Sequence, residues 1–272
     1  MVDQVLPAFH FPLWDDQVPL ALGKSENDRP SLEIYRPPES ERLAPTLIIF
    51  PGGGYNHHAN HEGQGYAQWF TSLGLVCAVV KYRLGSQGYR HPTMLLDAAR
   101  SVRLLRSKAK TLRVDPLRVG IIGSSAGGHL SAMLITQDEI PYLDASDPVD
   151  HFSSMPDFCI LCYPVISMQK YPHQGSRNFL LGENPTLELL NETSPERHVF
   201  IKTPPCFIWH TVEDPKVNVN HSLLFASSLQ SARIPFELHI YQQGDHGLGL
   251  ANGHPWTDEC QRWLRENRFI DS

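Results

Sequence analysis

The pattern of apolar and polar residues along the chain switches repeatedly between two periods. Short apolar runs predict buried β-strands, and segments whose apolar residues recur at steps of three and four predict amphipathic helices. The strands are expected at 32–36, 46–50, 75–82, 119–122, 158–166, 205–211 and 236–241, and the helices at 92–112, 126–136, 219–232 and 255–267. Strands that alternate with helices predict an α/β fold, a mostly parallel central sheet with helices on both faces.

One long segment interrupts this alternation. Between 167 and 203 the periodicity is poor, and Pro, Asn and Gly are frequent. We interpret the segment as an insertion over the top of the sheet, where it would form a short lid or a substrate-facing loop. The chain has 272 residues, of which 41% are hydrophobic. Residues 1–272 are therefore expected to form a single domain around a large core.

Charge and composition exclude several classes of partner. The net charge is −6 with histidine neutral, and Lys and Arg are scattered along the chain, so we expect no nucleic-acid partner. No apolar stretch approaches the length of a membrane span, and the N-terminus lacks the pattern of a signal peptide. We therefore expect no membrane partner and a cytoplasmic protein. The odd number of cysteines, five, predicts buried reduced thiols and no disulfide framework.

The segment Gly123-Ser-Ser-Ala-Gly127 has the pattern G-x-S-x-G. It follows an apolar β-branched run and precedes a helical pattern, which is the strand–turn–helix context of a nucleophile elbow. In such an elbow a tight turn lifts Ser125 clear of the sheet, and the N–H of Ala126 points to where an oxyanion would form. The simpler alternative is a Gly/Ser turn in which Ser125 only caps the helix.

A second glycine-rich loop, Gly52-Gly-Gly-Tyr55, follows the strand predicted at 46–50. Ligands of open parallel sheets bind beyond the carboxyl ends of the strands, so this loop is expected to lie near the elbow. Glycines leave backbone N–H groups unobstructed, and we assign Gly53 and Gly54, with Ala126, to an oxyanion hole. The alternative is a turn that merely connects a strand to a helix.

An acid and a histidine follow the last two predicted strands. Asp214 is favoured over Glu213 as the acid, because a short carboxylate before Pro215 suits a fixed turn. His246 lies between glycines on the loop after the final strand, where it could reach Ser125. The order Ser125, Asp214, His246 is the order that α/β-hydrolases use. An imidazole can take the proton of a serine hydroxyl, and a carboxylate fixes the imidazole tautomer.

Two sets of residues could suggest a metal, but we predict none and no cofactor. Cys159 and Cys162 have the spacing of a metal knuckle, yet residues three apart on a strand face opposite sides of the sheet. His57, His58 and His61 cluster near the glycine loop, where three imidazoles could bind a metal. We expect them instead to line the pocket or to cap the following helix.

With these features in place, the chain resembles the acetylxylan esterase-like carbohydrate esterases and carboxylesterases of the α/β-hydrolase superfamily, including those with feruloyl esterase activity. The stretches that carry the resemblance extend over nearly the whole chain. They are Leu13-Trp14, Pro51-Gly-Gly-Gly-Tyr55, His61-Glu-Gly63, Lys81-Tyr-Arg-Leu84, Asp97-Ala-Ala-Arg100, Gly123 to His129, Asp214 and His246-Gly-Leu-Gly-Leu-Ala251. Two positions depart from the family pattern. Ser124 stands where a large apolar residue is usual before the nucleophile, and Asn218 stands where a proline often follows the valine after the acid.

The resemblance implies an α/β-hydrolase fold, a serine esterase mechanism and the same three catalytic positions. We therefore expect a serine carboxylic-ester hydrolase for short acyl esters, with acetylated sugars or oligosaccharides as candidate small-molecule substrates. Tyr55 and His57, at the end of the glycine loop, are expected to bind substrate. An amidase, formamidase or small peptidase on the same triad is the first alternative, and a non-catalytic binding protein on a hydrolase fold is the second.

Overall fold

The computed structural model describes residues 7–15, 17–38, 42–138, 140, 147–250 and 253–271. Ala251, the last residue of the motif that begins at His246, lies outside them. The strands are β1 Phe9–Pro12, β2 Ser31–Tyr35, β3 Ala44–Phe50, β4 Val76–Lys81, β5 Val114–Ser124, β6 Phe158–Cys162, β7 Cys206–Thr211 and β8 Phe236–Tyr241. The helices are α1 Asn60–Ser72, α2 Thr93–Ser107, α3 Ala109–Leu112, α4 Ala126–Ile135, α5 Gln174–Leu181, α6 Leu187–Glu192, α7 Asn220–Ser231 and α8 Trp256–Glu266. Short 3-10 helices lie at Glu26–Asp28, Gly85–Gln87, Pro148–His151 and Pro195–Arg197.

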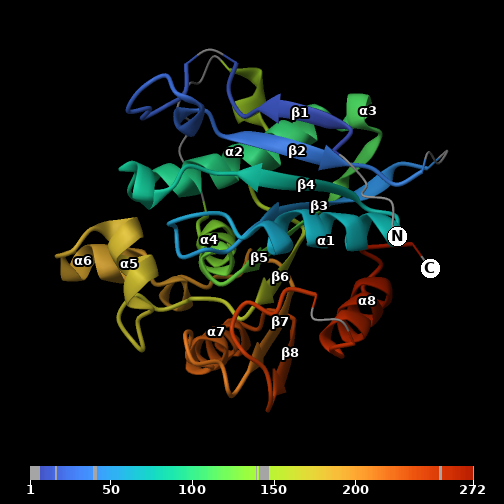
Figure 1. The fold of residues 1–272 in the computed structure, drawn as a ribbon. Helices are drawn as coiled ribbons and strands as arrows, with labels where there is room; N and C mark the ends of the chain where they lie inside the picture. Colours follow the sequence, from blue (N-terminus) through green and yellow to red (C-terminus); the bar gives the residue numbers. More distant parts are fainter. Residues whose placement is uncertain are drawn as a thin grey trace.

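The strands form one eight-stranded sheet of order β1-β2-β4-β3-β5-β6-β7-β8 (Figure 1). All pairs from β4 to β8 are parallel, and β1 and β2 are antiparallel at one edge. Chain order changes direction around β3, because β4 lies on one side of it and β5 on the other. Loops that leave β3 and β5 therefore diverge and open a crevice, which is where open parallel sheets bind ligands.

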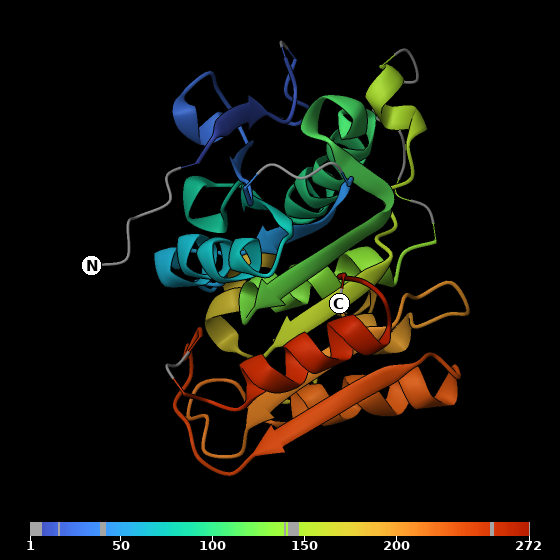
Figure 2. The same cartoon turned by 90° about the vertical axis from the view of Figure 1, so that its right-hand side faces the viewer.

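Helices cover both faces of the sheet, as the sequence pattern predicted (Figures 1 and 2). One buried cluster joins the sheet to α2, α4 and α7, and the other joins it to α1 and α8. The helix expected at 92–112 is divided into α2 and α3 by Lys108, whose ψ of 10° leaves the helical range. The strand expected at 158–166 ends at Cys162, because Tyr163 takes a φ of 35° and Pro164 follows.

Two motifs of the resemblance pair with each other just past the carboxyl end of β4. The guanidinium of Arg83 lies 2.6 Å from an Asp97 carboxylate oxygen, and both side chains are almost fully buried. Arg100, from the same motif as Asp97, binds the carboxylates of Asp147 and Asp150. A buried ion pair is tolerated only when its geometry satisfies both partners, as it does here. These motifs therefore tie α2 to the segment that follows β4, at the same end of the sheet as Ser125.

The insertion at 167–203 contains α5 and α6, which lie beyond the ends of the parallel strands (Figure 1). Two fully buried histidines attach it to the body of the protein. His129 Nε2 donates to the carbonyl of Thr193 at 2.8 Å, and His221 Nε2 donates to the carbonyl of Tyr171 at 2.9 Å. The insertion is thus hydrogen-bonded to α4 and α7, the helices behind it.

These buried histidines predict a loss of stability in mild acid. Burial lowers the pKa of His129 to about 3 and that of His221 to about 4, whereas an unfolded histidine titrates near 6.5. The unfolded chain therefore takes up protons first as the pH falls. Their contribution is complete above about pH 6.5 and declines as the pH falls from there toward the folded-state values of about 4 and 3. Urea unfolding at stepped pH should show the fall, and His129→Gln should flatten it; an unaltered slope in that variant would contradict the assignment.

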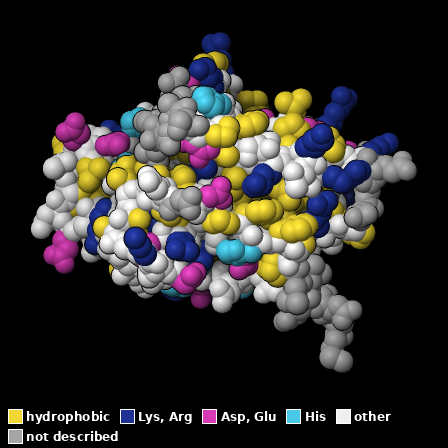
Figure 3. Space-filling view, turned by 90° about the horizontal axis from the view of Figure 1, so that it is seen from above, with side chains coloured by type: hydrophobic (Ala, Val, Ile, Leu, Met, Phe, Trp, Pro, Cys, Tyr) yellow, Lys and Arg dark blue, Asp and Glu magenta, His cyan; other side chains and the backbone are white. Residues whose placement is uncertain are grey.

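Acidic, basic and apolar side chains are interspersed on the face shown in Figure 3. Among the described residues, no helix has the length and apolar character needed to cross a membrane. All five cysteines are buried and free. Cys159 packs into the cluster of α2, α4 and α7, and Cys162 packs into that of α1 and α8. The two thiols thus face opposite sides of the sheet, as their spacing predicted.

Candidate active site

Ser125 lies in the turn between β5 and α4. Its backbone has φ 53° and ψ −116°, a conformation that non-glycine residues rarely adopt and that costs energy to maintain. The flanking glycines are required by close contact: a Cβ on Gly123 would lie 2.1 Å from the carbonyl oxygen of Gly127, and a Cβ on Gly127 would lie 2.0 Å from that of Phe50. The turn is therefore a strained strand-to-helix elbow that presents the serine side chain above the sheet.

The three residues that the sequence assigned to catalysis form a continuous hydrogen-bonded chain. Ser125 Oγ lies 2.8 Å from His246 Nε2, and His246 Nδ1 lies 2.7 Å from Asp214 Oδ2. With His246 neutral, Nδ1–H donates to the carboxylate and Nε2 accepts the serine hydroxyl. The imidazole is thereby oriented with its free lone pair toward Ser125, as removal of the hydroxyl proton requires.

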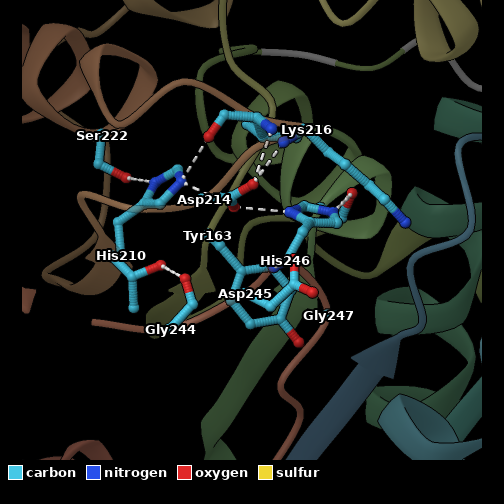
Figure 4. A network of polar contacts seen from close by, with 12 residues as sticks. Tyr163, His210, Asp214, Lys216, Ser222, Gly244, Asp245, His246 and Gly247 are labelled. Carbon is cyan, nitrogen blue, oxygen red and sulfur yellow. Dashed lines mark hydrogen bonds and ion pairs between the residues drawn. The ribbon is translucent and has the colours of Figure 1, made fainter. Parts of the chain in front are cut away.

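The Asp214 carboxylate has more partners than the sequence suggested. His210, on β7, donates from Nε2 to Asp214 Oδ2 at 3.2 Å, and the backbone N–H groups of Lys216 and Val217 donate to Oδ1 at 2.9 Å each. Figure 4 shows His210 and His246 on opposite sides of the carboxylate. Burial would raise the pKa of Asp214, but the hydrogen bonds from His210, His246 and Val217 outweigh it and hold the pKa below its ordinary range. The carboxylate is therefore ionised at neutral pH.

The glycine loop lies beside the elbow, because β3 and β5 are adjacent in the sheet. Gly53 and Gly54 have φ values of 116° and 67°, which only glycine adopts without strain. Within the part of the chain that the structure describes, the N–H groups of Gly53 and Gly54 have no hydrogen-bond partner. Ala126 is the first residue of α4, so its N–H has no acceptor inside the helix. All three groups are available to a developing negative charge.

A pocket of about 390 Å³ opens above Ser125. Three sources supply its walls: the glycine loop, the His246 loop and the insertion at 167–203. Its lining consists of Gly53, Gly54, Asn56, His57, Ala59, His61, Glu62, Ser125, His173, Gly175, Phe179, Lys216, His246 and Gly247. The volume is near the lower end of the range for small-molecule sites, and polar side chains are unusually frequent.

The two residues expected to bind substrate differ in their positions. His57 lines the pocket, but Tyr55 does not. Tyr55 is fully buried, and its hydroxyl donates to His129 Nδ1 at 2.7 Å. The prediction for Tyr55 is therefore corrected: its φ of 60° directs the side chain into the core, away from the solvent side of the loop. The residue supports the glycine loop from below.

The three clustered histidines have separate contacts. His57 faces the pocket, His58 packs edge-on against Tyr82, and His61 Nε2 donates to the carbonyl of Gly247 at 2.9 Å. Among the described residues, the group close enough to share a metal ion is Glu237, His239 and Glu259, on β8 and α8. Arg262 already binds both of those glutamates, so one positive charge partly offsets the negative charge of this group.

Sequence reasoning missed two residues that contact the site. His210 lies within the strand that leads to Asp214, and nothing in its spacing distinguished it from the other histidines. Glu62 was named only within the motif His61-Glu-Gly63, but its side chain is buried and accepts a hydrogen bond from the Gly52 N–H at 2.7 Å. Ser124, which departs from the family pattern, lies 3.0 Å from the hydroxyl of Tyr66. A polar residue is thus accommodated under the elbow by a buried hydroxyl partner.

Comparisons with known proteins agree with this arrangement. The family model BD-FAE matches residues 32–229, a range that includes Ser125 and Asp214 and stops before His246. An endo-1,4-beta-xylanase B of Butyrivibrio fibrisolvens is 38% identical over 76% of this chain, and an acetylxylan esterase of Xylanibacter ruminicola is 31% identical over 90%. The chain spans 33% and 50% of the lengths of these two proteins.

Solved structures match over nearly the full length. The acetyl ester-xyloside bifunctional hydrolase of Caldicellulosiruptor lactoaceticus has a TM-score of 0.92 and 42% identity, covering 99% of this chain and 100% of the other. The esterase Est2 of Thermogutta terrifontis, solved with propionate bound, has a TM-score of 0.76 and 25% identity, covering 93% and 94%. The described sheet and helices, the elbow and these matches together show that the chain belongs to the BD-FAE family and has the α/β-hydrolase fold.

Proposed function

We propose that this protein is a serine carboxylic-ester hydrolase. The observation that carries the proposal is the unbroken chain from Ser125 Oγ through His246 to Asp214, at the floor of a pocket. Ser125 is the nucleophile, His246 is the general base and then the general acid, and Asp214 orients the imidazole. The N–H groups of Ala126, Gly53 and Gly54 receive the oxyanion. The mechanism needs no metal or cofactor.

The reaction proceeds through an acyl-enzyme. Ser125 Oγ attacks the ester carbonyl while its proton moves to His246 Nε2, and the carbonyl oxygen becomes the oxyanion. Collapse breaks the bond to the alcohol, which leaves with the proton from His246. Water then attacks the acyl-serine, gives its proton to His246 and releases the carboxylic acid as Ser125 recovers its proton. The ionised Asp214 stabilises the imidazolium that forms in both halves.

The named relatives support an ester as the substrate. One is called an acetylxylan esterase, one an acetyl ester-xyloside bifunctional hydrolase, and several others are called esterases. The chain spans only part of the length of these curated relatives, so its own pocket is the better guide to its substrate. Est2 has been solved with propionate and with butyrate, which are short acyl groups.

The polar wall of the pocket favours an oxygen-rich alcohol. His173 Nδ1 accepts the backbone N–H of Ser176 at 3.2 Å, so a neutral His173 carries its proton on Nε2 as a donor. The Lys216 side chain extends past His246 in Figure 4, and within the described part of the chain its ammonium makes no ion pair. Donors facing the pocket suit hydroxyl and ether oxygens. We infer acetylated sugars or short oligosaccharides as the substrate class.

The proposed function is tested by activity and by labelling of the same serine. The purified chain should hydrolyse p-nitrophenyl acetate, and a fluorophosphonate probe should abolish the activity and add its mass to the peptide that contains Ser125. Turnover of the matched anilide, p-nitroacetanilide, should be much slower. Faster cleavage of the anilide would favour an amidase, and the absence of labelling would favour a binding protein.

Acyl-chain length provides a further prediction. A pocket of about 390 Å³ must hold both halves of the ester. Each added methylene contributes up to about 0.8 kcal/mol of burial where space exists, and none where it does not. We expect kcat/KM for p-nitrophenyl esters to be greatest between acetyl and butyryl and to fall steeply by octanoyl. A rate that continues to rise through octanoyl and decanoyl would show an open acyl channel and a lipase-like specificity.

A further inference from the structure

Two loops must keep a fixed separation for the proposed reaction, although the sheet does not connect them directly. The glycine loop follows β3 and the His246 loop follows β8, and β5, β6 and β7 lie between these strands. Hydrogen bonds between neighbouring strands therefore set the distance between the two loops only through three intervening strands. Transition-state stabilisation is sensitive to displacements of about 1 Å. A more direct connection between the loops would consequently affect the rate.

Glu62 provides one end of such a connection. It lies in the first turn of α1, is 2% exposed, and accepts the Gly52 N–H on Oε2 at 2.7 Å. Its other oxygen, Oε1, accepts the hydroxyl of Tyr163 at 2.7 Å. A Cβ on Gly52 would lie 2.6 Å from Oε2, so only glycine allows this close approach. Glu62 thus holds the residue that precedes the proposed oxyanion donors Gly53 and Gly54.

Tyr163 provides the other end. It follows β6 with a φ of 35° and is 1% exposed. While its hydroxyl donates to Glu62, the same oxygen accepts the backbone N–H of Gly249 at 2.9 Å. Its ring packs edge-on against His246, with ring centroids 5.1 Å apart. Tyr163 therefore contacts the His246 loop at both its backbone and its catalytic side chain.

The chemistry of this pair fits a permanent structural link. A buried carboxylate is costly unless donors satisfy it, and Glu62 has one at each oxygen. Burial and the nearby Glu62 raise the pKa of Tyr163 well above its ordinary value, so the phenol keeps the proton that it donates. Both carboxylate oxygens of Glu62 are occupied, and neither is bonded to Ser125 or His246. The carboxylate is thus poorly suited to act as a second general base.

We propose that Glu62 and Tyr163 are positioning residues that hold the oxyanion loop and the His246 loop in register. The inference rests on the proposed esterase function. It adds two residues that do not contact the substrate but position the oxyanion donors and His246. It predicts that weakening the link lowers kcat while leaving KM nearly constant, because the donors and the imidazole are misplaced mainly with respect to the transition state.

Two conservative variants test the link. Glu62→Gln keeps the shape but replaces one acceptor oxygen with an NH₂ group that faces a donor. Tyr163→Phe keeps the ring against His246 and leaves the Gly249 N–H and one Glu62 oxygen without a partner. Each should lower kcat for p-nitrophenyl acetate by about 10- to 100-fold and change KM by less than about threefold. The double variant should lose less than the product of the single losses, because both break one chain of hydrogen bonds.

The matched control is Tyr66→Phe. Tyr66 is equally buried and its hydroxyl lies 3.0 Å from Ser124 Oγ and 3.4 Å from the Tyr163 hydroxyl, but it bonds to neither loop. Thermal unfolding should show a loss of stability comparable to that of Tyr163→Phe. The kcat of Tyr66→Phe, by contrast, should fall by less than about threefold. A rate loss as large as that of Tyr163→Phe would indicate a general structural effect and would overturn the inference.

A second readout separates positioning from stability. The inhibitor 1,1,1-trifluoro-2-butanone adds to the serine as a hemiketal whose oxygen occupies the oxyanion site, so its affinity measures the alignment of the two loops. Affinity should fall in parallel with kcat/KM in both variants. Affinity and kcat at wild-type levels in folded Tyr163→Phe would refute the link even if Glu62→Gln fails to fold. Failure of the proposed function itself would be distinct, since the wild-type protein would then neither hydrolyse the ester nor bind the ketone.

Discussion

Replacing Ser125 with alanine is expected to lower kcat for p-nitrophenyl acetate by on the order of 10⁴-fold or more, because the proposed reaction has no other nucleophile. The Oγ atom is the only part of the residue that faces His246, at 2.8 Å. Alanine keeps the Cβ and the backbone of the elbow, so the fold should be retained. Circular dichroism and thermal unfolding of the variant should match those of the wild-type protein.

Ser124→Ala is the appropriate control, because it removes a hydroxyl one residue away in the same turn. Ser124 is fully buried and lies 3.0 Å from the Tyr66 hydroxyl, so its loss should affect stability more than rate. We expect a rate within about tenfold of wild type for this variant. If Ser125→Ala hydrolysed the ester within tenfold of wild type, Ser125 would not be the nucleophile.

Asp214→Asn is expected to have the second largest effect, a decrease in kcat approaching 10⁴-fold. An asparagine at this position has one acceptor oxygen where the carboxylate has two. Asp214 Oδ2 receives N–H groups from both His246 and His210, so an amide NH₂ turned toward them would repel at least one donor. His246 would then favour the tautomer with its proton on Nε2, which cannot accept the proton of Ser125.

The neighbouring acid provides a direct comparison. Glu213 is exposed, and its backbone N–H bonds to the carbonyl of Gln242. Glu213→Gln should therefore change kcat by less than about threefold. Steady-state kinetics of the two variants would decide between the acids, and the reverse ranking would move the catalytic carboxylate to Glu213.

Much of the fold follows from local pattern. The apolar runs located β2 to β8, and the spacing of apolar residues located α2, α4, α7 and α8, because each pattern reflects which side of an element is buried. The sequence analysis did not locate β1 or delimit α1. β1 is a short edge strand with mostly exposed side chains, and α1 contains two glycines, Gly63 and Gly65. Both are stabilised by packing against the sheet more than by their own composition.

The candidate site shows the same division. Ser125 could be proposed as the nucleophile because a G-x-S-x-G turn needs small residues at fixed positions, and this requirement is visible within five residues. His246 and Asp214 could be proposed as its partners because they follow successive strands of a predicted sheet. Tyr55 was misplaced, because the direction of its side chain depends on a left-handed backbone and on the buried His129, which is 74 residues away in sequence.

By itself, the sequence determined the α/β architecture, the elbow and the order of the three proposed catalytic residues, because strand, helix and turn preferences act over a few neighbouring residues. Only the tertiary structure decided which side chains support them. Glu62 lies 101 residues from Tyr163, which lies 86 residues from Gly249, yet two hydrogen bonds join all three. Such contacts depend on how distant strands pack, and the residues next to each position in the sequence do not indicate which distant residue it contacts.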